Sequence, residues 1–463
     1  MFISTVVALG LAATGWARPT GPGALCEALP AAEDCGSGLP NCDVCHTTPP
    51  ARNSYGLQLG ERLPEPTSAQ EFSGAIQPII LEVMPLDADG DGFDNETELR
   101  LGTNPGNDRS FPMETGCSGR SVNPRWNVCG YDHDYVLKKV ALDFCGYSPR
   151  YAEMQAFTRL DVTAKERIIE ETFERCVDTP YWQGRDGVLW RMAHPKVRPL
   201  AAIKSGPQAG PVPLADYDDD YALFVYTQTD DRDVRDVITA DYYVTLTGNP
   251  PTYTERMARP DQSLAPEYRV GMISSRWFFV INTMFTAVPR TAAAQAYRAY
   301  LGLDIAKSEG LIPPQGEALV DYDEKGITAD GCAVCHTTLD PLTYPFTRYG
   351  GIEPPSSGLY DPMRMMRRDP AIDGANIRDV PEEGYLFGQR VESLVEWADL
   401  AANSDEFAKA TVLEYWRLLM GASPTQAETS EFDALWQGLK GEHQYRVENM
   451  LKALIRTEAY GVP

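Results

Sequence analysis

The sequence predicts a mostly α-helical protein in which a compact module stands at each end of a helical middle domain. Three observations lead to this prediction. The pattern Cys-x-x-Cys-His occurs twice in the 463 residues, once early and once in the C-terminal half. Apolar residues elsewhere recur at helical spacing, and no alternating strand pattern of comparable length is present. The length itself is typical of two or three domains.

The two Cys-x-x-Cys-His copies are typical of covalent haem attachment. Two cysteines at this spacing can each form a thioether bond to one haem, and the following histidine becomes the proximal ligand of the iron. We therefore expect two covalently attached c-type haems, each in a cytochrome c-like module. The predicted attachment residues are Cys42, Cys45 and His46 in NCDVCHTTPP, and Cys332, Cys335 and His336 in GCAVCHTTLD.

Two other interpretations of the pattern are a thioredoxin-like redox pair and half of a zinc site. A zinc site needs a second pair of ligands at finger-like spacing. No such pair lies near either copy.

An export signal should precede the first haem motif, because haem c is attached outside the cytoplasm. The opening MFISTVVALGLAATGWARPT has a short apolar run followed by small residues, so residues 1–17 are predicted to be a signal peptide that ends at Ala17. We expect a periplasmic or extracellular, cell-surface location. No later stretch of eighteen or more apolar residues occurs, so no membrane span is predicted.

An acidic loop follows the first motif within the predicted N-terminal haem module, residues 18–110. DADGDGFDNETE has carboxylates at positions 1, 3 and 5, glycine at 6 and glutamate at 12, as in an EF-hand calcium loop. One structural calcium ion is expected, and an acidic turn without metal is the alternative. With the following LGTNP, the loop resembles the calcium repeats of thrombospondin type 3. The expected ligands are Asp87, Asp89, Asp91, the carbonyl of Phe93, Asn95 and Glu98, with Gly92 allowing the turn.

The six cysteines outside the haem motifs are expected to form three disulfides. Their number is even, and an exported chain meets an oxidising compartment. Pairing them in sequence order closes the shortest loops, and buried thiols are the alternative. The predicted bonds are Cys26–Cys35, Cys117–Cys129 and Cys145–Cys176.

The helical middle domain is predicted for residues 111–320, after a linker rich in Gly, Pro and Ser. Thr163 and Glu166 predict a capping box at the start of one helix. An alanine-rich helix is expected to begin after Pro289 and to end at Gly310.

Three further helices are predicted in the C-terminal haem module, residues 321–463. The first has Ser404 as its cap and Gly421 as its end, and the second begins with Pro424. The third carries one apolar face at helical spacing. That face consists of Val447, Met450, Leu451, Leu454 and Ile455.

The net charge of −25 restricts the possible partners. Nucleic acid is disfavoured, because phosphate contacts need patches of Lys and Arg. A redox partner with a basic surface is favoured instead, because the negative field would attract it.

The second haem motif and its surroundings resemble the large cytochromes found in planctomycetes and related bacteria. In those proteins Cys-x-x-Cys-His is followed by Asp-Pro, an aromatic segment, a Gly-rich turn and two or three helices. Asp340, Pro341 and the DGANI turn match here, and DDRDVRDVITADYYV and FTAVPRTAAA are also similar. The chain departs at Thr343, where glycine is more usual, and in the PMRMMRRDP insertion. The resemblance spans about two-thirds of the chain and implies a haem protein without naming a substrate.

The sixth ligand of each iron decides between an electron carrier and an enzyme. Met or His there is typical of a carrier, whereas an open position permits ligand binding or catalysis. Met84, in EVMPLD, is the candidate for the first haem, and a core methionine is the alternative. His194 has either a distal or a structural role. The candidates for the second haem are Met363, Met365, Met366 and Met420.

We expect an exported dihaem c-type cytochrome that carries out electron transfer. No hydrolase triad, phosphate loop or nicotinamide fingerprint is present. A peroxidase-like dihaem oxidoreductase with one open haem is the first alternative, because the large middle domain has no obvious carrier role. An envelope interaction or scaffold protein is the second.

Overall fold

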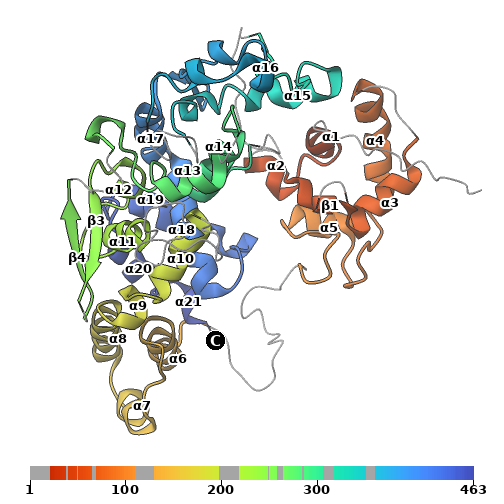
Figure 1. The fold of residues 1–463 in the computed structure, drawn as a ribbon. Coiled ribbons are helices and arrows are strands. Elements are labelled where there is room, and N and C mark those ends of the chain that lie inside the picture. Colours follow the sequence, from red (N-terminus) through yellow and green to blue (C-terminus); the bar gives the residue numbers. More distant parts are fainter. Residues whose placement is uncertain are drawn as a thin grey trace, which may run out of the picture. The chain divides into compact units, whose positions relative to one another are not determined.

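The computed structural model describes residues 21–37, 40–48, 51–64, 69–110, 130–197, 218–248, 250–257, 264–283, 286–305, 318–350 and 360–462. The chain forms two compact units, residues 1–113 and 114–463. Helices dominate both units, which confirms the prediction of a mostly α-helical protein (Figure 1). The predicted signal peptide and the predicted Cys117–Cys129 bond lie outside the described residues.

The N-terminal unit packs its helices around one apolar core. The long helix α4 lies against both α1 and α3. Its apolar residues Phe72, Ile76, Ile79, Ile80 and Val83 share one helical face and are all buried in this core. The elements are α1 (Gly21–Ala28), α2 (Glu33–Ser37), the 3-10 turn η1 (Cys42–Val44), β1 (His46–Thr48), β2 (Ala51–Arg52), α3 (Ser54–Arg62), α4 (Ala69–Val83) and α5 (Asn95–Arg100).

The first part of the C-terminal unit is a set of helices with one hairpin. Its elements are α6 (His133–Val140), the π-helix η2 (Ala141–Cys145), α7 (Tyr151–Thr158), α8 (Val162–Val177), α9 (Pro180–Gln183), α10 (Val188–Val197), α11 (Asp218–Thr227), α12 (Asp236–Thr239), β3 (Tyr243–Thr247), β4 (Thr252–Arg256), η4 (Pro266–Tyr268), α13 (Arg276–Thr283), α14 (Arg290–Ala296) and the π-helix η5 (Tyr297–Leu301).

The second part of this unit begins with the helix that carries the second haem motif. Its elements are α15 (Asp330–Leu339), η6 (Tyr344–Phe346), η7 (Met365–Arg367), α16 (Pro370–Asp373), η8 (Ile377–Asp379), β5 (Gly384–Leu386), β6 (Gln389–Val391), α17 (Leu394–Ala402), α18 (Asp405–Met420), η9 (Gln426–Glu428), α19 (Thr429–Lys440), α20 (Val447–Leu454) and α21 (Glu458–Gly461).

The two parts of the C-terminal unit share one hydrophobic core. Buried residues from Val136 to Tyr460 belong to a single cluster. Helix α18 packs on η5, α17 on α12, and α21 on α6, so the last helices lie among the earlier ones (Figure 1). The Trp397 indole N–H donates to the Tyr297 hydroxyl at 3.0 Å inside this core.

Several local predictions in the C-terminal unit are confirmed. Ser404 caps α18 by accepting a hydrogen bond from the Phe407 N–H at 3.1 Å. Gly421 ends α18 with φ +77°, a left-handed conformation that glycine adopts without a steric cost. The predicted apolar face of α20 is buried. Two predicted disulfides, Cys26–Cys35 in the other unit and Cys145–Cys176, are also present.

Three helix boundaries differ from the prediction. Asp161, and not the Thr163 and Glu166 pair, caps α8, because the Asp161 carboxylate accepts from the Ala164 N–H at 2.9 Å. The alanine-rich helix continues as η5 and ends at Gly302, with φ +67°, well before Gly310, which lies outside the described residues.

The third wrongly predicted boundary is the start of α19, which does not begin at Pro424. The Glu428 carboxylate accepts from the Thr425 N–H at 2.7 Å and hydroxyl at 2.8 Å. These bonds fold the segment before the helix into its own turn, so α19 starts at Thr429.

The strands of the described residues form three antiparallel hairpins, β1–β2, β3–β4 and β5–β6. The longest, β3–β4, pairs Tyr243 with Arg256 and Thr247 with Thr252. Strands of two to five residues are too short to show an alternating pattern, so the sequence did not reveal them. No described helix is long and apolar enough to cross a membrane.

Candidate metal centres

The first Cys-x-x-Cys-His motif, at which haem attachment is predicted, forms a short turn that the start of α3 holds in place. Cys42–Val44 form η1. Asn53 reaches back to this turn, and its Nδ2 donates to the carbonyl oxygens of Asp43 and Val44, each at 2.9 Å. The Asn53 Oδ1 accepts from the Gly56 N–H at 2.8 Å and so caps α3. One buried side chain therefore fixes both the motif and the helix behind it.

Gly56 brings the backbone of α3 directly against the motif. A Cβ atom at this position would lie 2.0 Å from the carbonyl oxygen of Cys45. The Asn53 N–H donates to the same Cys45 oxygen at 3.1 Å. A side chain at residue 56 would therefore displace either α3 or the second cysteine of the motif.

His46 is oriented by the hairpin that follows the motif. It lies in β1 opposite Arg52 of β2. Its Nδ1 is 3.2 Å from the carbonyl oxygen of Ala51. Because a carbonyl only accepts, this contact places the ring proton on Nδ1 and leaves the Nε2 lone pair for a metal.

The Cys45 thiol lacks the properties of a redox-active thiolate. Burial, and to a smaller extent the neighbouring Cys42, raise the pKa of Cys45 from 9.0 to about 12. In a redox pair the lowered pKa belongs to the attacking cysteine, which in this motif would be Cys42. Thioether attachment needs no lowered pKa at either cysteine of the finished protein.

The second motif has a different backbone, because it lies entirely within α15. Cys332 and Cys335 are three residues apart and therefore lie on one side of the helix. Cys332 is exposed, and the neighbouring apolar side chain of Val334 is 62% exposed. The described helix therefore leaves Cys332 accessible at its surface, whereas Cys335 is partly buried.

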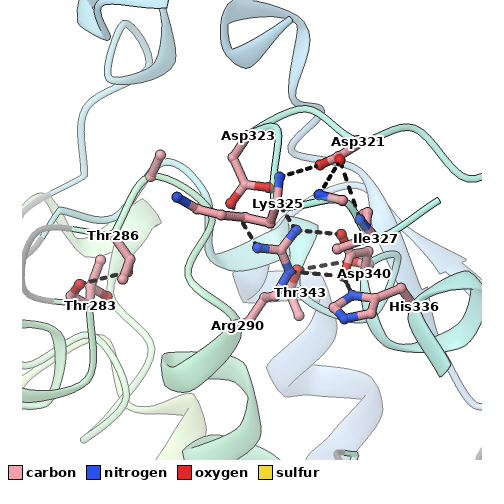
Figure 2. A network of polar contacts seen from close by, with 12 residues as sticks. Thr283, Thr286, Arg290, Asp321, Asp323, Lys325, Ile327, His336, Asp340 and Thr343 are labelled. Atoms are coloured by element: carbon pink, nitrogen blue, oxygen red, sulfur yellow. Dashed lines mark hydrogen bonds and ion pairs between the residues drawn. The ribbon is translucent and has the colours of Figure 1, made fainter. Parts of the chain in front are cut away.

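His336 is held by a buried carboxylate and not by a carbonyl. Its Nδ1 lies 2.7 Å from Oδ1 of Asp340, the residue that directly follows α15. Asp340 is 1% exposed and also binds the guanidinium of Arg290 (Figure 2). As for His46, the proton is placed on Nδ1 and the Nε2 lone pair is left for a metal.

No protein-family model matches the chain, and no curated protein or solved structure matches it either. The donor sets of the two motifs therefore carry the functional argument by themselves.

The acidic loop brings three carboxylates together. One oxygen each of Asp87, Asp89 and Asp91 lies within 4.8 Å of the others. Asp87 accepts from the N–H groups of Gly90 at 2.7 Å and Gly92 at 3.0 Å, which folds the loop around it. Gly92 has φ +102°, the sharp turn for which a glycine was expected here.

Glu98 supplies the most specific sign of a cation site. Its side chain is fully buried, and its Oε2 has no hydrogen-bond partner among the described residues. One buried oxygen each of Asp89 and Asp91 also has none there. Burial, and then the nearby Asp89, Asp91 and Asp87, raise the pKa of Glu98 from 4.5 to about 8. In the part of the chain that the structure describes, the group of carboxylate oxygens that lie close together consists of Asp87, Asp89 and Asp91, without Glu98. Carboxylate oxygens without donors fit a calcium ion, which binds six to eight oxygens.

Asn95 and Phe93 are tied into the structure through their hydrogen-bond donor groups. The Asn95 Nδ2 donates to the carbonyl of Val83 at 2.6 Å, which ties α5 to the end of α4. Its buried Oδ1 has no hydrogen-bond partner within the described ranges. The Phe93 N–H donates to Asp91 at 3.0 Å. Calcium ligation by Asn95 and by the Phe93 carbonyl stays a prediction.

A short path joins the acidic loop to the first haem motif. The Thr103 N–H donates to the Glu98 carbonyl at 2.9 Å. The adjacent Asn104 donates from Nδ2 to the Asp43 carbonyl of the motif, also at 2.9 Å. Sequence reasoning missed Asn53 and Asn104. An asparagine directly before a helical pattern is an N-cap signal and could have revealed Asn53, whereas nothing local points to Asn104.

The predicted distal ligands differ in their exposure and in their contacts. Met84 is 3% exposed and lies in the same hydrophobic cluster as Val44 of the first motif. Met365 is 1% exposed, whereas Met363 and Met366 are 49% and 51% exposed. The remaining candidates are Met420, partly buried against the large core, and His194, whose Nδ1 lies 2.8 Å from the Tyr221 hydroxyl.

Proposed function

We propose that this protein is an exported c-type cytochrome that carries two covalently attached haems and transfers electrons. The observation that carries the proposal is the pair of Cys-x-x-Cys-His motifs, in each of which an acceptor holds the histidine Nδ1. An Nδ1 acceptor is the usual partner of a metal-bound histidine. This arrangement is expected of proximal haem ligands at both sites.

The residues of each motif have separate tasks in this proposal. Cys42 and Cys45 would anchor one haem and Cys332 and Cys335 the other, with His46 and His336 as proximal ligands. A bound haem supplies a reversible one-electron couple. The chain then fixes the haem covalently, orients the imidazole ring and sets the polarity around it.

A calcium ion in the acidic loop is part of the same proposal. Asp87, Asp89, Asp91 and Glu98 would bind it, with Asn95 and the Phe93 carbonyl as further ligands. Support comes from the buried oxygens of Asp89, Asp91 and Glu98 that lack donors among the described residues. The path through Asn104 gives this ion a structural role, because it leads to the turn of the first haem motif.

Two arguments support export, one from the proposed haem attachment and one from the disulfides. Haem c attachment is expected outside the cytoplasm, and the structure contains the disulfides Cys26–Cys35 and Cys145–Cys176. Disulfides persist in oxidising compartments such as the periplasm and the cell exterior. We therefore place the protein in one of these compartments.

Haem extraction tests the attachment. Thioether bonds survive denaturation, so acid–acetone treatment of the purified protein should leave two haems bound. The double substitution Cys332→Ala and Cys335→Ala should leave one. Extraction of all haem from the unmodified protein would contradict the proposal.

Iron coordination tests the electron-transfer role. A carrier should be low-spin and six-coordinate at both haems. Met84→Ala should make the first haem high-spin if Met84 is its distal ligand. A high-spin haem in the unmodified protein that reacts rapidly with peroxide would instead support the dihaem oxidoreductase.

A further inference from the structure

We propose that Asp340, with Arg290 and Asp323, forms a built-in countercharge that gives the C-terminal haem a lower reduction potential than the N-terminal haem. Asp340 is a positioning residue in this proposal, because it acts on the haem through His336. The inference rests on the proposed haem attachment and deepens it, because it assigns the two haems different roles. The C-terminal haem becomes the electron donor of the pair.

The cluster is tightly connected (Figure 2). Arg290 binds Asp340 through Nε at 2.9 Å and Nη2 at 2.7 Å. It binds Asp323 through Nη1 at 2.7 Å and Nη2 at 3.0 Å. The Asp340 Oδ1 that accepts from Arg290 Nε also contacts His336 Nδ1 at 2.7 Å. Arg290 therefore makes one bidentate ion pair with Asp340 and another with Asp323, and these pairs fix the Asp340 carboxylate that orients His336.

Segments far apart in the chain build this cluster. Arg290 is the first residue of α14, and Asp340 follows α15. Asp323 lies in a loop that Asp321 closes by accepting from the N–H groups of residues 325, 326 and 327 at 3.0, 2.7 and 3.3 Å. Gly374, with φ +116°, packs on this loop, where a Cβ would lie 2.7 Å from the Tyr322 carbonyl oxygen. Because these separate segments all support the cluster, they hold Asp340, the acceptor of the His336 N–H, rigidly in place.

The charges of the cluster do not cancel. Asp323 and Asp340 are 6% and 1% exposed and contribute two negative charges, whereas Arg290 contributes one positive charge. One negative charge is therefore left over next to His336. An oxidised haem iron carries one more positive charge than a reduced one, so this surplus favours the oxidised state. Burial keeps the interaction strong, because the local dielectric constant is lower than in water.

The first haem motif has no equivalent among the described residues. His46 contacts the neutral carbonyl of Ala51 at 3.2 Å, a longer contact than that between His336 and Asp340. A carboxylate acceptor makes the imidazole a stronger electron donor to iron than a carbonyl does. Hydrogen bonding and net charge are among the properties with which proteins set haem potentials. Both differences lower the potential of the C-terminal haem relative to the N-terminal one.

Spectroelectrochemical titration of the full-length dihaem protein tests the proposal. Asp340→Asn removes the charge and weakens the hydrogen bond to His336. It should shift the oxidised-to-reduced equilibrium of the C-terminal haem at least about tenfold toward reduction, a rise of about 59 mV for a one-electron couple. Asp340→Glu should restore part of the difference, and the N-terminal haem should not change in either variant. The nuclear magnetic resonance signal of the proximal ring N–H should shift for the C-terminal haem alone.

Asp323→Asn separates charge from hydrogen bonding. Among the described residues, Asp323 contacts Arg290 and not His336, so this variant neutralises the surplus charge and keeps the Asp340 bond. Asp323→Asn should raise the reduction potential of the C-terminal haem by a smaller amount than Asp340→Asn. It also keeps the proposal testable if the Asp340→Asn variant fails to bind its haem. Asp361→Asn is the matched control, because Asp361 is a 7% exposed carboxylate that pairs with Arg367 at 2.5 Å and contacts no motif residue in the described structure.

Two results would overturn the proposal. One is a C-terminal haem with the higher potential, which can be measured by itself after Cys42→Ala and Cys45→Ala. The other is an unchanged potential in both Asp340→Asn and Asp323→Asn. Failure of the proposed function has a different signature, because the unmodified protein would then lose its haem on extraction before any potential is measured.

Discussion

At the scale of single residues, Gly56 has no room for a side chain, because the backbone of Cys45 lies directly against it. The Gly56→Ala variant should lose most of its N-terminal haem, because the added Cβ would lie 2.0 Å from the Cys45 carbonyl oxygen and move the second attachment cysteine. Haem staining and haem quantification should then report about one covalent haem per chain in place of two.

Gly74→Ala is the control for that experiment. Gly74 lies in α4, and a Cβ there would meet nothing within 4 Å. Alanine in a helix should leave both haems in place and stabilise the N-terminal unit by about 0.5–1 kcal/mol. Two full haems in Gly56→Ala would mean that the contact seen between α3 and the motif does not constrain attachment.

The buried carboxylate of Glu98 predicts a pH dependence. Without metal, burial and then Asp89, Asp91 and Asp87 raise its pKa from 4.5 to about 8. A raised pKa means that its proton stabilises the metal-free fold below pH 4.5 and that this stability is lost as the pH rises through about 8. Calcium must displace the proton, so its affinity should increase about tenfold per pH unit up to that value.

Calcium titration at about pH 6 and about pH 8 measures this dependence. Glu98→Gln should bind calcium weakly at both values, because its amide has no charge and cannot release a proton. Equal affinity of the unmodified protein at the two pH values would contradict the role assigned to Glu98.

At the scale of secondary-structure elements, the N-terminal end of α3 holds the first motif in place through Asn53. Asn53→Ala removes the helix cap, which costs about 0.5–2 kcal/mol, and also leaves the carbonyls of Asp43 and Val44 without the Asn53 donor. Thermal unfolding should therefore show a less stable N-terminal unit together with a changed spectrum of its haem. Asp161→Ala removes a comparable cap from α8 in the other unit and should leave the N-terminal haem unchanged. The same spectral change in both variants would contradict a specific role for Asn53.

The elements also show where sequence reasoning succeeds. The cap Ser404, the end at Gly421 and the apolar face of α20 depend on neighbours within a few residues, so the sequence predicts them. The choice of Asp161 over Thr163 depends on where the backbone first becomes helical, which local pattern alone does not decide. For the sites, motif spacing predicts which residues come together. The contacts of Asn104 with Asp43, and of Arg290 with Asp340, span 61 and 50 residues and cannot be predicted from spacing.

At the scale of the whole molecule, the two compact units should unfold separately. Each has its own hydrophobic core, residues 24–99 in one and 136–460 in the other. Differential scanning calorimetry should therefore show two transitions. Chelation of calcium should lower only the transition of the N-terminal unit, because a ligand stabilises the unit whose native state binds it. A single transition, or an equal shift of both, would contradict independent units with calcium in one of them.

The net charge of −25 predicts how the protein meets its partner. A negative field attracts a basic redox protein over distances limited by salt, since the Debye length falls from about 30 Å at 0.01 M to about 8 Å at 0.15 M. The second-order rate of electron exchange with a small basic cytochrome should therefore fall at least about tenfold across this range. Stopped-flow absorbance measures the rate, and an acidic redox protein is the control, because repulsion should make its rate rise with salt. A rate that does not depend on salt would show that the acidic surface does not steer the encounter, and the partner would then have to be recognised by short-range contacts alone.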